Sequence, residues 1–141
     1  AIDEMLTRFD LPISHGDDAT SLIDAKVVGH DKRFNLMYLD FSGGQFTVTD
    51  RELPLESKVR LRVSASDVSL TQKLQTNTSI LNIFSAIVDE IVPEGRSQVM
   101  VRLKIKDVSM LSCITRKSAE LLDLNPGKEV YAQIKSVALL S

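Results

Sequence analysis

An internal repeat of short alternating segments constrains the fold of this chain more than any other feature. The segment FNLMYLDFSGG in the first half parallels QVMVRLKIKDV in the second, and SKVRLRVSASDVSL parallels KEVYAQIKSVALL, with two extra residues in the first copy. The repeat period is about 60 to 65 residues. Alternation of apolar and polar residues is the pattern of half-buried strands. The sequence therefore predicts an all-β chain built from two tandem copies of a five-stranded unit.

The same copies divide the chain into segments. Residues 1–19 carry a short amphipathic stretch, which Pro12 ends, followed by the polar connector SHGDDA. We predict that residues 1–19 are the tail of a larger preceding domain plus a linker. Residues 20–72 are then the first repeat and residues 73–141 the second.

One segment of the second repeat breaks the strand pattern. TRKSAELLDLNPGK begins with Thr115 as a helix N-cap and continues with good helix formers. It closes at the turn Asn125-Pro126-Gly127-Lys128, where Gly127 stands at the position of a type II turn that needs a positive φ. The sequence predicts one short helix between two strands of the second repeat.

Composition and charge exclude several classes of function. The formal net charge is −2 at pH 7, without the strongly basic surface of a nucleic-acid binder. Cys113 is the only cysteine, which excludes an internal disulfide and a zinc site built from cysteines. The chain carries no P-loop and no nucleophile with a base, so we expect no catalytic residue in it. No apolar run reaches the ~18 residues that a membrane span needs, and we expect a water-soluble unit.

Three features that resemble sites have simpler explanations. FSGGQF (41–46) is similar to a nucleotide-binding signature, but a glycine pair between two alternating runs predicts a hairpin turn. His15 and His30 lack a second ligand at metal-like spacing, so we predict loop histidines and no metal site. Cys113 lies in an apolar run and is predicted to be a small core residue.

A group of uncharged donors with one lysine gives the strongest indication of a site. The residues are Ser79, Thr115, Ser118, Lys135 and Ser136. Hydroxyls, the free N–H groups of a helix start and one ammonium suit a tetrahedral oxyanion that is fully deprotonated and only accepts hydrogen bonds, such as molybdate, tungstate or sulfate. The segments that contain these residues have no acidic side chain. The simpler alternative is that Thr115 and Ser118 only cap the helix, while Lys135 lies on a solvated strand face.

Several of these stretches resemble a known family. TSILN, LSCIT and especially VYAQIKSVAL are similar to the Mop (molbindin) repeat, also called the TOBE domain. RLRVSASDVSL and the N-terminal LTRFDLP extend the likeness, so the whole chain resembles the C-terminal part of the ATP-binding subunit of bacterial molybdate importers, the ModC type. The resemblance implies two tandem OB-like barrels and a dimer contact through them. It also implies molybdate or tungstate as ligand in some members, with no cofactor or metal.

The resemblance further implies roles for residues and partners. The oxyanion contacts carry over to Ser79, Thr115, Ser118, Lys135 and Ser136. The partners implied are a second copy of the chain and, through an ATPase domain that would precede residue 1, the membrane permease of the importer. Such a subunit is cytoplasmic and peripheral at the inner membrane, and nucleic acid is not among the implied partners.

This sequence departs from the family at one contact. Stand-alone molybdate binders read T-S-x-R-N, and this chain has Leu81 where the arginine stands. Loss of a charge-assisted partner costs about 1.5–3 kcal/mol. In the first repeat Ser64 replaces the equivalent of Lys135, so we expect no independent strong site there. Two alternatives stay open, a purely structural dimerisation module and an OB-type nucleic-acid binder, the latter disfavoured by few aromatic residues and negative charge.

Overall fold

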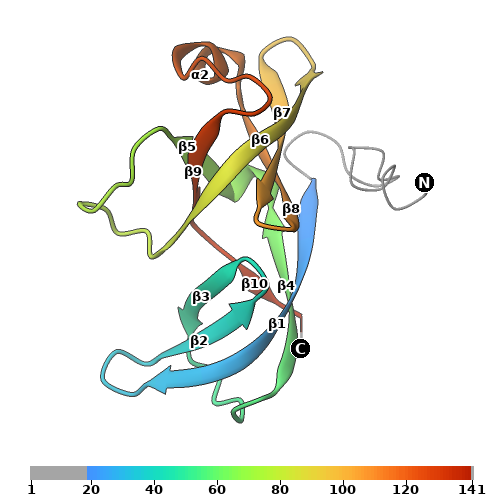
Figure 1. The fold of residues 1–141 in the computed structure, drawn as a ribbon. Helices are drawn as coiled ribbons and strands as arrows, with labels where there is room; N and C mark the ends of the chain where they lie inside the picture. The colour runs from blue at the N-terminus through green and yellow to red at the C-terminus, as the bar shows by residue number, and fades with distance from the viewer. Residues whose placement is uncertain (1–18, 141) are drawn as a thin grey trace.

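The computed structural model describes residues 19–140, which form two five-stranded sheets (Figure 1). In chain order the elements are β1 (Thr20–Asp31), β2 (Leu36–Phe41), β3 (Gly44–Thr49), β4 (Lys58–Ser64), the 3₁₀ turn η2 (Ala65–Asp67), β5 (Val68–Thr71), β6 (Asn82–Glu94), β7 (Gln98–Ile105), β8 (Val108–Thr115), α2 (Arg116–Leu121), β9 (Glu129–Ile134) and β10 (Ala138–Leu139). The prediction of an all-β chain with tandem OB-like barrels is confirmed. The tail predicted over residues 1–19 lies, apart from Ala19, outside the described residues.

The predicted alternation decides which face of each strand is buried. On β4, Val59, Leu61 and Val63 are buried and the residues between them are not. On β1 the buried residues are Ile23, Ala25 and Val27, while the intervening side chains face solvent. Each strand therefore presents one apolar face to a common core, which is the arrangement that a period of two dictates.

The two sheets exchange their last strands. The first sheet has the order β10-β4-β1-β2-β3 and the second β5-β9-β6-β7-β8. Thus β5, which ends the first repeat, pairs with β9, with Leu70 opposite Ala132. In return β10, which ends the second repeat, pairs with β4, with Leu139 opposite Leu61. The sheets therefore do not follow the predicted division at residues 72 and 73, because each repeat completes the sheet of the other.

Strand register defines which residues of the two repeats are equivalent. Both long first strands carry a bulge, between Val27 and Gly29 in β1 and between Val88 and Glu90 in β6. The β2–β3 and β7–β8 hairpins close at matching pairs, Phe41 with Gly44 and Ile105 with Val108. When the bulges and the hairpin pairs are matched, every strand of one repeat has an equivalent strand in the other. The two halves therefore have an approximate two-fold relation.

Three phenylalanines join the two barrels at the centre of the core. Phe41 and Phe46 belong to the first sheet, and Phe84 comes from β6 of the second. The ring centroids of Phe46 and Phe84 are 5.0 Å apart and those of Phe41 and Phe84 are 5.3 Å apart. Edge-to-face packing at this separation is favourable beyond the area that it buries. One hydrophobic cluster therefore extends through both barrels.

The glycine pair of FSGGQF forms the predicted hairpin and also allows a close contact between barrels. Ser42 and Gly43 connect β2 to β3. A Cβ atom on Gly43 would lie 2.9 Å from the carbonyl oxygen of Ile105 in β7 and 2.6 Å from the ring of Phe41. Since the carbonyl belongs to backbone of the second sheet, it cannot move aside cheaply. The position requires glycine because the two barrels meet there.

Replacement of Gly43 by alanine is therefore expected to destabilise the protein. Overpacking at a site closed by backbone typically costs about 1–3 kcal/mol. Chemical denaturation followed by circular dichroism would measure the loss. Gly95 is a suitable control position, because a Cβ atom there would meet nothing within 4 Å, although its φ of +71° adds some strain of its own. A G43A stability equal to that of the unaltered chain would contradict the close contact.

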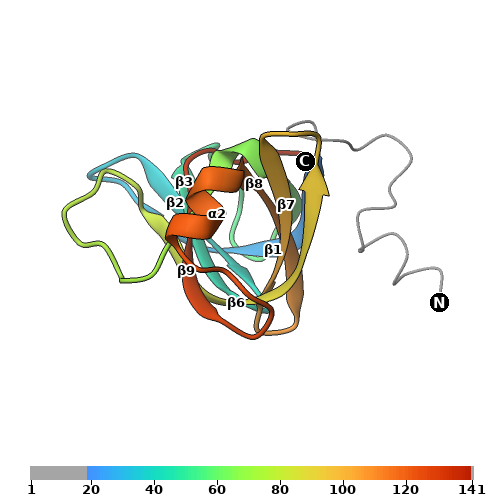
Figure 2. The same ribbon diagram turned by 90° about the horizontal axis from the view of Figure 1, so that it is seen from above.

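The short helix lies where the sequence predicts it. Thr115 is the N-cap of α2, and its side chain accepts a hydrogen bond from the N–H of Ser118. The following turn closes with the Lys128 N–H donating to the Asn125 carbonyl at 3.0 Å, and Gly127 has φ +94°. Seen from above, α2 lies over one end of the second barrel (Figure 2). Within residues 19–140, α-helices are too short and polar to span a bilayer.

Candidate anion-binding site

A cavity of about 650 Å³ opens where the two barrels meet. Its walls are the start of β2 and the end of β3 from the first sheet, and the segment before β6 together with the β9–β10 connection from the second. The polar residues that line it are Thr47, Thr49, Thr78, Ser79, Asn82, Lys135 and Ser136. The cavity therefore brings together three of the five predicted contacts, Ser79, Lys135 and Ser136.

Backbone pairing fixes the segment that carries Lys135. Ile134, the last residue of β9, pairs with Asn82, the first of β6. The N–H of Lys135 then donates to the carbonyl of Asp67 at 2.9 Å. Beyond this anchor the chain crosses to the first sheet as β10. The side chains of Lys135 and Ser136 stand exposed on this crossing segment, free to meet a ligand in the cavity.

Asn82 lines the cavity, and its side chain forms with β3 the two hydrogen bonds that a neighbouring strand would form. Its Oδ1 accepts from the N–H of Thr47 at 2.8 Å, and its Nδ2 donates to the carbonyl of Thr47 at 3.0 Å. Because β3 is an edge strand, these backbone groups would otherwise lack a partner within the sheet. The single carboxamide thus joins the edge of the first sheet to β6, whose first residue is paired with Ile134, the residue before Lys135.

The electrostatic character of the cavity is positive and donor-rich. Lys135 is the one charged residue among the described residues that line it, and none of them is acidic. The hydroxyls of Thr47, Thr49, Thr78, Ser79 and Ser136 can all donate. Such a lining suits a ligand that only accepts hydrogen bonds. A ligand that must also donate a proton finds no carboxylate there to accept it.

Thr115 and Ser118 do not line this cavity. Thr115 is paired with Gln98, and Gln98 lies beside the end of β6. Lys135 instead follows Ile134, which is paired with the first residue of β6. The two residues therefore lie at opposite ends of β6. Figure 1 shows α2 at the other end of the second sheet from the β9–β10 connection. The two hydroxyls bond each other at 3.0 Å, and the Ser118 N–H donates to the Thr115 Oγ1 at 3.0 Å. In this chain they cap the helix.

Hydroxyl groups of the first repeat line the cavity in place of the predicted Thr115. Counting from the hairpin pairs, the equivalent of Thr115 is Arg51, just beyond β3, and β3 is the element that faces Lys135. Thr47 and Thr49 were not predicted. Their spacing in FTVTD puts both side chains on one face of the strand, and this alternation was a signal that could have revealed them.

At the equivalent place in the other half, buried apolar residues replace the polar lining. Register makes Leu111 the equivalent of Thr47, Cys113 that of Thr49 and Ala65 that of Ser136. These three residues form a small cluster together with Ala19 and Met100. Cys113 is thus a buried core residue, as predicted. The two-fold relation of the backbone is kept while the chemistry of the two places has diverged.

Ser21, the equivalent of Asn82, also has a structural partner. Its Oγ accepts from the N–H of Leu111 at 3.0 Å, in a buried position. Each repeat therefore uses a polar side chain at the beginning of its long strand to hydrogen-bond the third strand of the other repeat. The hydroxyl oxygen of Ser21 is therefore engaged in joining the two repeats.

A larger surface hollow of about 850 Å³ on the first sheet has a different character. Five charged residues line it, three basic and two acidic: Lys26, Lys58, Arg60, Asp24 and Asp40. The Arg60 Nε lies 3.1 Å from Asp24 Oδ1. Lys26 lies 2.9 Å from Glu56, which raises the pKa of the lysine through the hydrogen bond and the opposite charge. Neighbouring carboxylates thus already compensate two of its three cations.

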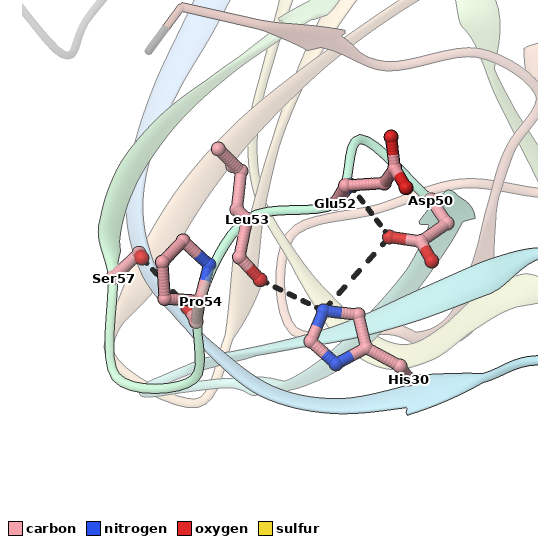
Figure 3. A network of polar contacts seen from close by, with 6 residues as sticks. All are labelled: His30, Asp50, Glu52, Leu53, Pro54 and Ser57. Atoms are coloured by element: carbon pink, nitrogen blue, oxygen red, sulfur yellow. Dashed lines mark hydrogen bonds and ion pairs between the residues drawn. The ribbon is translucent and has the colours of Figure 1, made fainter.

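His30 is a residue of β1 and not the predicted loop histidine, and it holds a neighbouring loop; His15 lies outside the described residues. Figure 3 shows its Nε2 directed at the Leu53 carbonyl, 2.8 Å away, with Asp50 Oδ1 at 3.8 Å. Because a carbonyl only accepts, Nε2 carries the proton. This contact holds the 50–57 loop against the end of β1. Among the described residues no group of three or more His, Cys, Asp or Glu side chains is placed to hold a metal.

Comparison with known proteins finds a domain family that is similar to the second repeat. Residues 78–140, which carry most of the second repeat and three of the cavity-lining site residues, match the TOBE domain family. This match confirms the resemblance of the second repeat to the TOBE domain that its sequence motifs indicated.

The particular relatives are ATP-binding subunits of molybdenum importers. The chain is 42% identical over 139 residues to the molybdenum import ATP-binding protein ModC of Aromatoleum aromaticum, 44% identical over 137 residues to that of Albidiferax ferrireducens, and 37% identical over 141 residues to ModC 1 of Azotobacter vinelandii. These matches cover 97–99% of this chain and 37–39% of the relatives. The chain therefore spans about two-fifths of their length and corresponds to their C-terminal part.

A solved structure shares the fold. The cytoplasmic molybdate-binding protein ModG, in a form with molybdate bound, superposes with a TM-score of 0.71 at 22% identity, covering 92% of this chain and 98% of ModG. Because nearly all of both chains is included, the likeness extends to the arrangement of the two barrels and not only to one of them.

Proposed function

We propose that this chain is the regulatory C-terminal part of a molybdate importer's ATP-binding subunit and binds one molybdate-type oxyanion between its barrels. The observation that carries the proposal is the cavity itself. It joins Lys135, Ser136 and Ser79 to threonines of the other repeat, with no acidic residue in its described lining. The ModC relatives and the fold shared with a molybdate-binding protein support the identity of the anion.

The chemistry of the lining favours molybdate, tungstate and sulfate over phosphate. The first three are fully deprotonated near neutral pH and accept hydrogen bonds on all four oxygens. Hydrogen phosphate carries a proton that needs an acceptor, and the lining offers it neutral hydroxyl oxygens but no carboxylate, so phosphate gains less than a fully deprotonated anion. Lys135 supplies one positive charge against the two negative charges of the ligand, so binding through this chain's second repeat alone is weak.

Regulation follows from the place of this domain in the proposed parent subunit. An ATPase domain would precede residue 1, hydrolyse ATP and contact the membrane permease from the cytoplasmic side. Anion that accumulates inside the cell would fill the cavity and restrain further import. The chain described here carries the sensing part of this scheme and is expected to show no ATP hydrolysis by itself.

A second copy of the chain is the proposed partner at α2. Thr115 and Ser118 lie at the end of the second barrel, away from Lys135 of their own chain. They would therefore contact an anion only from a neighbouring copy, in a homodimer formed through the barrels. We expect Thr115→Ala to weaken anion binding in the dimer and leave the binding of a dilute monomer unchanged.

The proposal is tested by thermal unfolding of the chain with sodium molybdate, tungstate, sulfate and phosphate at millimolar concentration. A ligand at 100 times its dissociation constant stabilises a protein by about 2.7 kcal/mol, which raises Tm by several degrees in a chain of this size. We expect this shift with molybdate and tungstate, a smaller one with phosphate, and its loss in Lys135→Gln. Lys135 is exposed, so the substitution is expected to leave the anion-free Tm almost unchanged.

The same experiment separates the proposal from the alternatives. Lys104→Gln is a matched control, since Lys104 is an exposed lysine of β7 that does not line the cavity. Equal melting temperatures with every anion would leave a purely structural dimerisation module. Salt-dependent binding of a single-stranded oligonucleotide would instead favour the nucleic-acid binder.

A further inference from the structure

A second, smaller cavity adjoins the candidate site. Its volume is about 230 Å³, and it is lined by Val48, Thr49, Arg51, Val137 and Leu139. Three of these residues, Val48, Thr49 and Val137, also line the larger cavity. The two spaces therefore adjoin each other at the end of β3 and the β9–β10 connection.

Arg51 is the charged residue of this smaller cavity. It follows β3 directly after Asp50, and its side chain is exposed. Among residues 19–140 no ion pair or hydrogen bond with another side chain is found for its guanidinium, whereas Arg60 and Arg102 are both paired with carboxylates. An arginine that stays unpaired beside a donor-lined cavity is available to an anion.

The charge of the ligand explains the need for a second cation. A fully deprotonated tetrahedral oxyanion carries two negative charges, and Lys135 alone faces it from the described lining. Lys135 lines the larger space from the β9–β10 connection, and Arg51, just beyond β3, lines the smaller space that adjoins it. A guanidinium presents two parallel N–H donors that match two oxygens of such an anion, which makes it a stronger partner than another hydroxyl.

We propose that Arg51, a residue of the first repeat, is the second cation of the oxyanion site in the second repeat. The inference rests on the proposed function and extends it, because it makes the site a joint property of both repeats. Arg51 occupies in the first repeat the position that Thr115 occupies in the second, so one backbone location provides a cation in one half and a helix cap in the other.

Calorimetric titration with sodium molybdate tests the role of Arg51. In Arg51→Gln we expect the dissociation constant to rise by roughly 10- to 100-fold, the loss typical of a charge-assisted hydrogen bond. Arg51→Lys should recover part of the affinity by restoring the charge without the paired donors. Arg33→Gln is the matched control, because Arg33 is an exposed arginine of the first repeat that stacks on Phe34 and lines neither cavity.

A tetrahedral anion with one charge gives a second readout. Perrhenate has the shape of molybdate and a single negative charge, so Lys135 alone can balance it. We expect Arg51→Gln to weaken molybdate binding far more than perrhenate binding. Anion-free melting temperatures of the two glutamine variants show that both remain folded.

The outcomes separate this inference from the proposed function. If the unaltered chain binds molybdate and Arg51→Gln binds it as well as Arg33→Gln does, the role of Arg51 is wrong and the site in the second repeat stands. If the unaltered chain binds none of the anions, both proposals fail. Equal losses for molybdate and perrhenate would show that Arg51 does not act as the second charge.

Discussion

Phe46→Ala is expected to lower the free energy of unfolding by about 3–5 kcal/mol, the usual cost of removing a buried aromatic ring. Phe46 is fully buried and contacts the rings of Phe41 and Phe84, one from each sheet. The cavity left behind would lie between the barrels, where neither sheet can collapse into it alone. Because domains of this size are stable by only about 5–15 kcal/mol, the loss removes a large part of the total.

Denaturant unfolding, followed by signals from both repeats, measures this effect. The expected result is a single transition at a lower midpoint, because the aromatic cluster belongs to both sheets. Phe34→Ala is the matched control, since Phe34 lies in the β1–β2 turn and is 63% exposed. This substitution should lower the free energy of unfolding far less than Phe46→Ala does. Two separate transitions, or an F46A stability close to that of F34A, would show that the ring cluster does not join the barrels.

Division of the chain between residues 72 and 73 is expected to abolish the folding of each half as a monomer. Residues 73–141 lose β5, the strand that pairs with β9, and their own β10 loses β4. Residues 20–72 lose β10 and keep β5 without a partner strand. Each half also loses the packing around Phe41, Phe46 and Phe84. A sequence repeat is ordinarily expected to fold as an independent unit. Here the exchange of β5 and β10 makes each repeat depend on the other.

The measurement is circular dichroism and sedimentation of the two fragments, apart and mixed. We expect little β structure in each fragment when dilute, and recovery of the native spectrum on mixing. A chain of residues 20–141, which lacks only the tail, is the control and should unfold in one cooperative transition. A monomeric 73–141 fragment that unfolds cooperatively near the midpoint of this control would contradict the dependence of each barrel on the other.

The sequence was sufficient to predict what depends on local pattern. Alternation at Val59, Leu61 and Val63, the cap at Thr115 and the turn at Gly127 each follow from the chemistry of adjacent residues, and all three are found in the structure. The exchange of β5 and β10 could not be predicted in this way. These strands have four and two residues, and strands so short carry no periodicity that identifies their partner.

The candidate site was predicted in part for the same reason. Ser79, Lys135 and Ser136 lie close in the structure because adjacent strands of one repeat hold them, which their resemblance to a family motif had indicated. Thr47 and Thr49 come from the other repeat, and only the three-dimensional arrangement brings them near Lys135. Thr115 is absent from the cavity because it ends β8 at the other end of the second sheet from Lys135, where it caps α2.

The short crossing between β9 and β10 has a mechanical consequence. Residues 135–137 form a wall of the cavity and are also the tether through which one barrel holds the edge of the other. Any rotation of one barrel about its neighbour must pull on this tether and deform the space behind it. A ligand bound in that space would therefore fix the orientation of one barrel relative to the other.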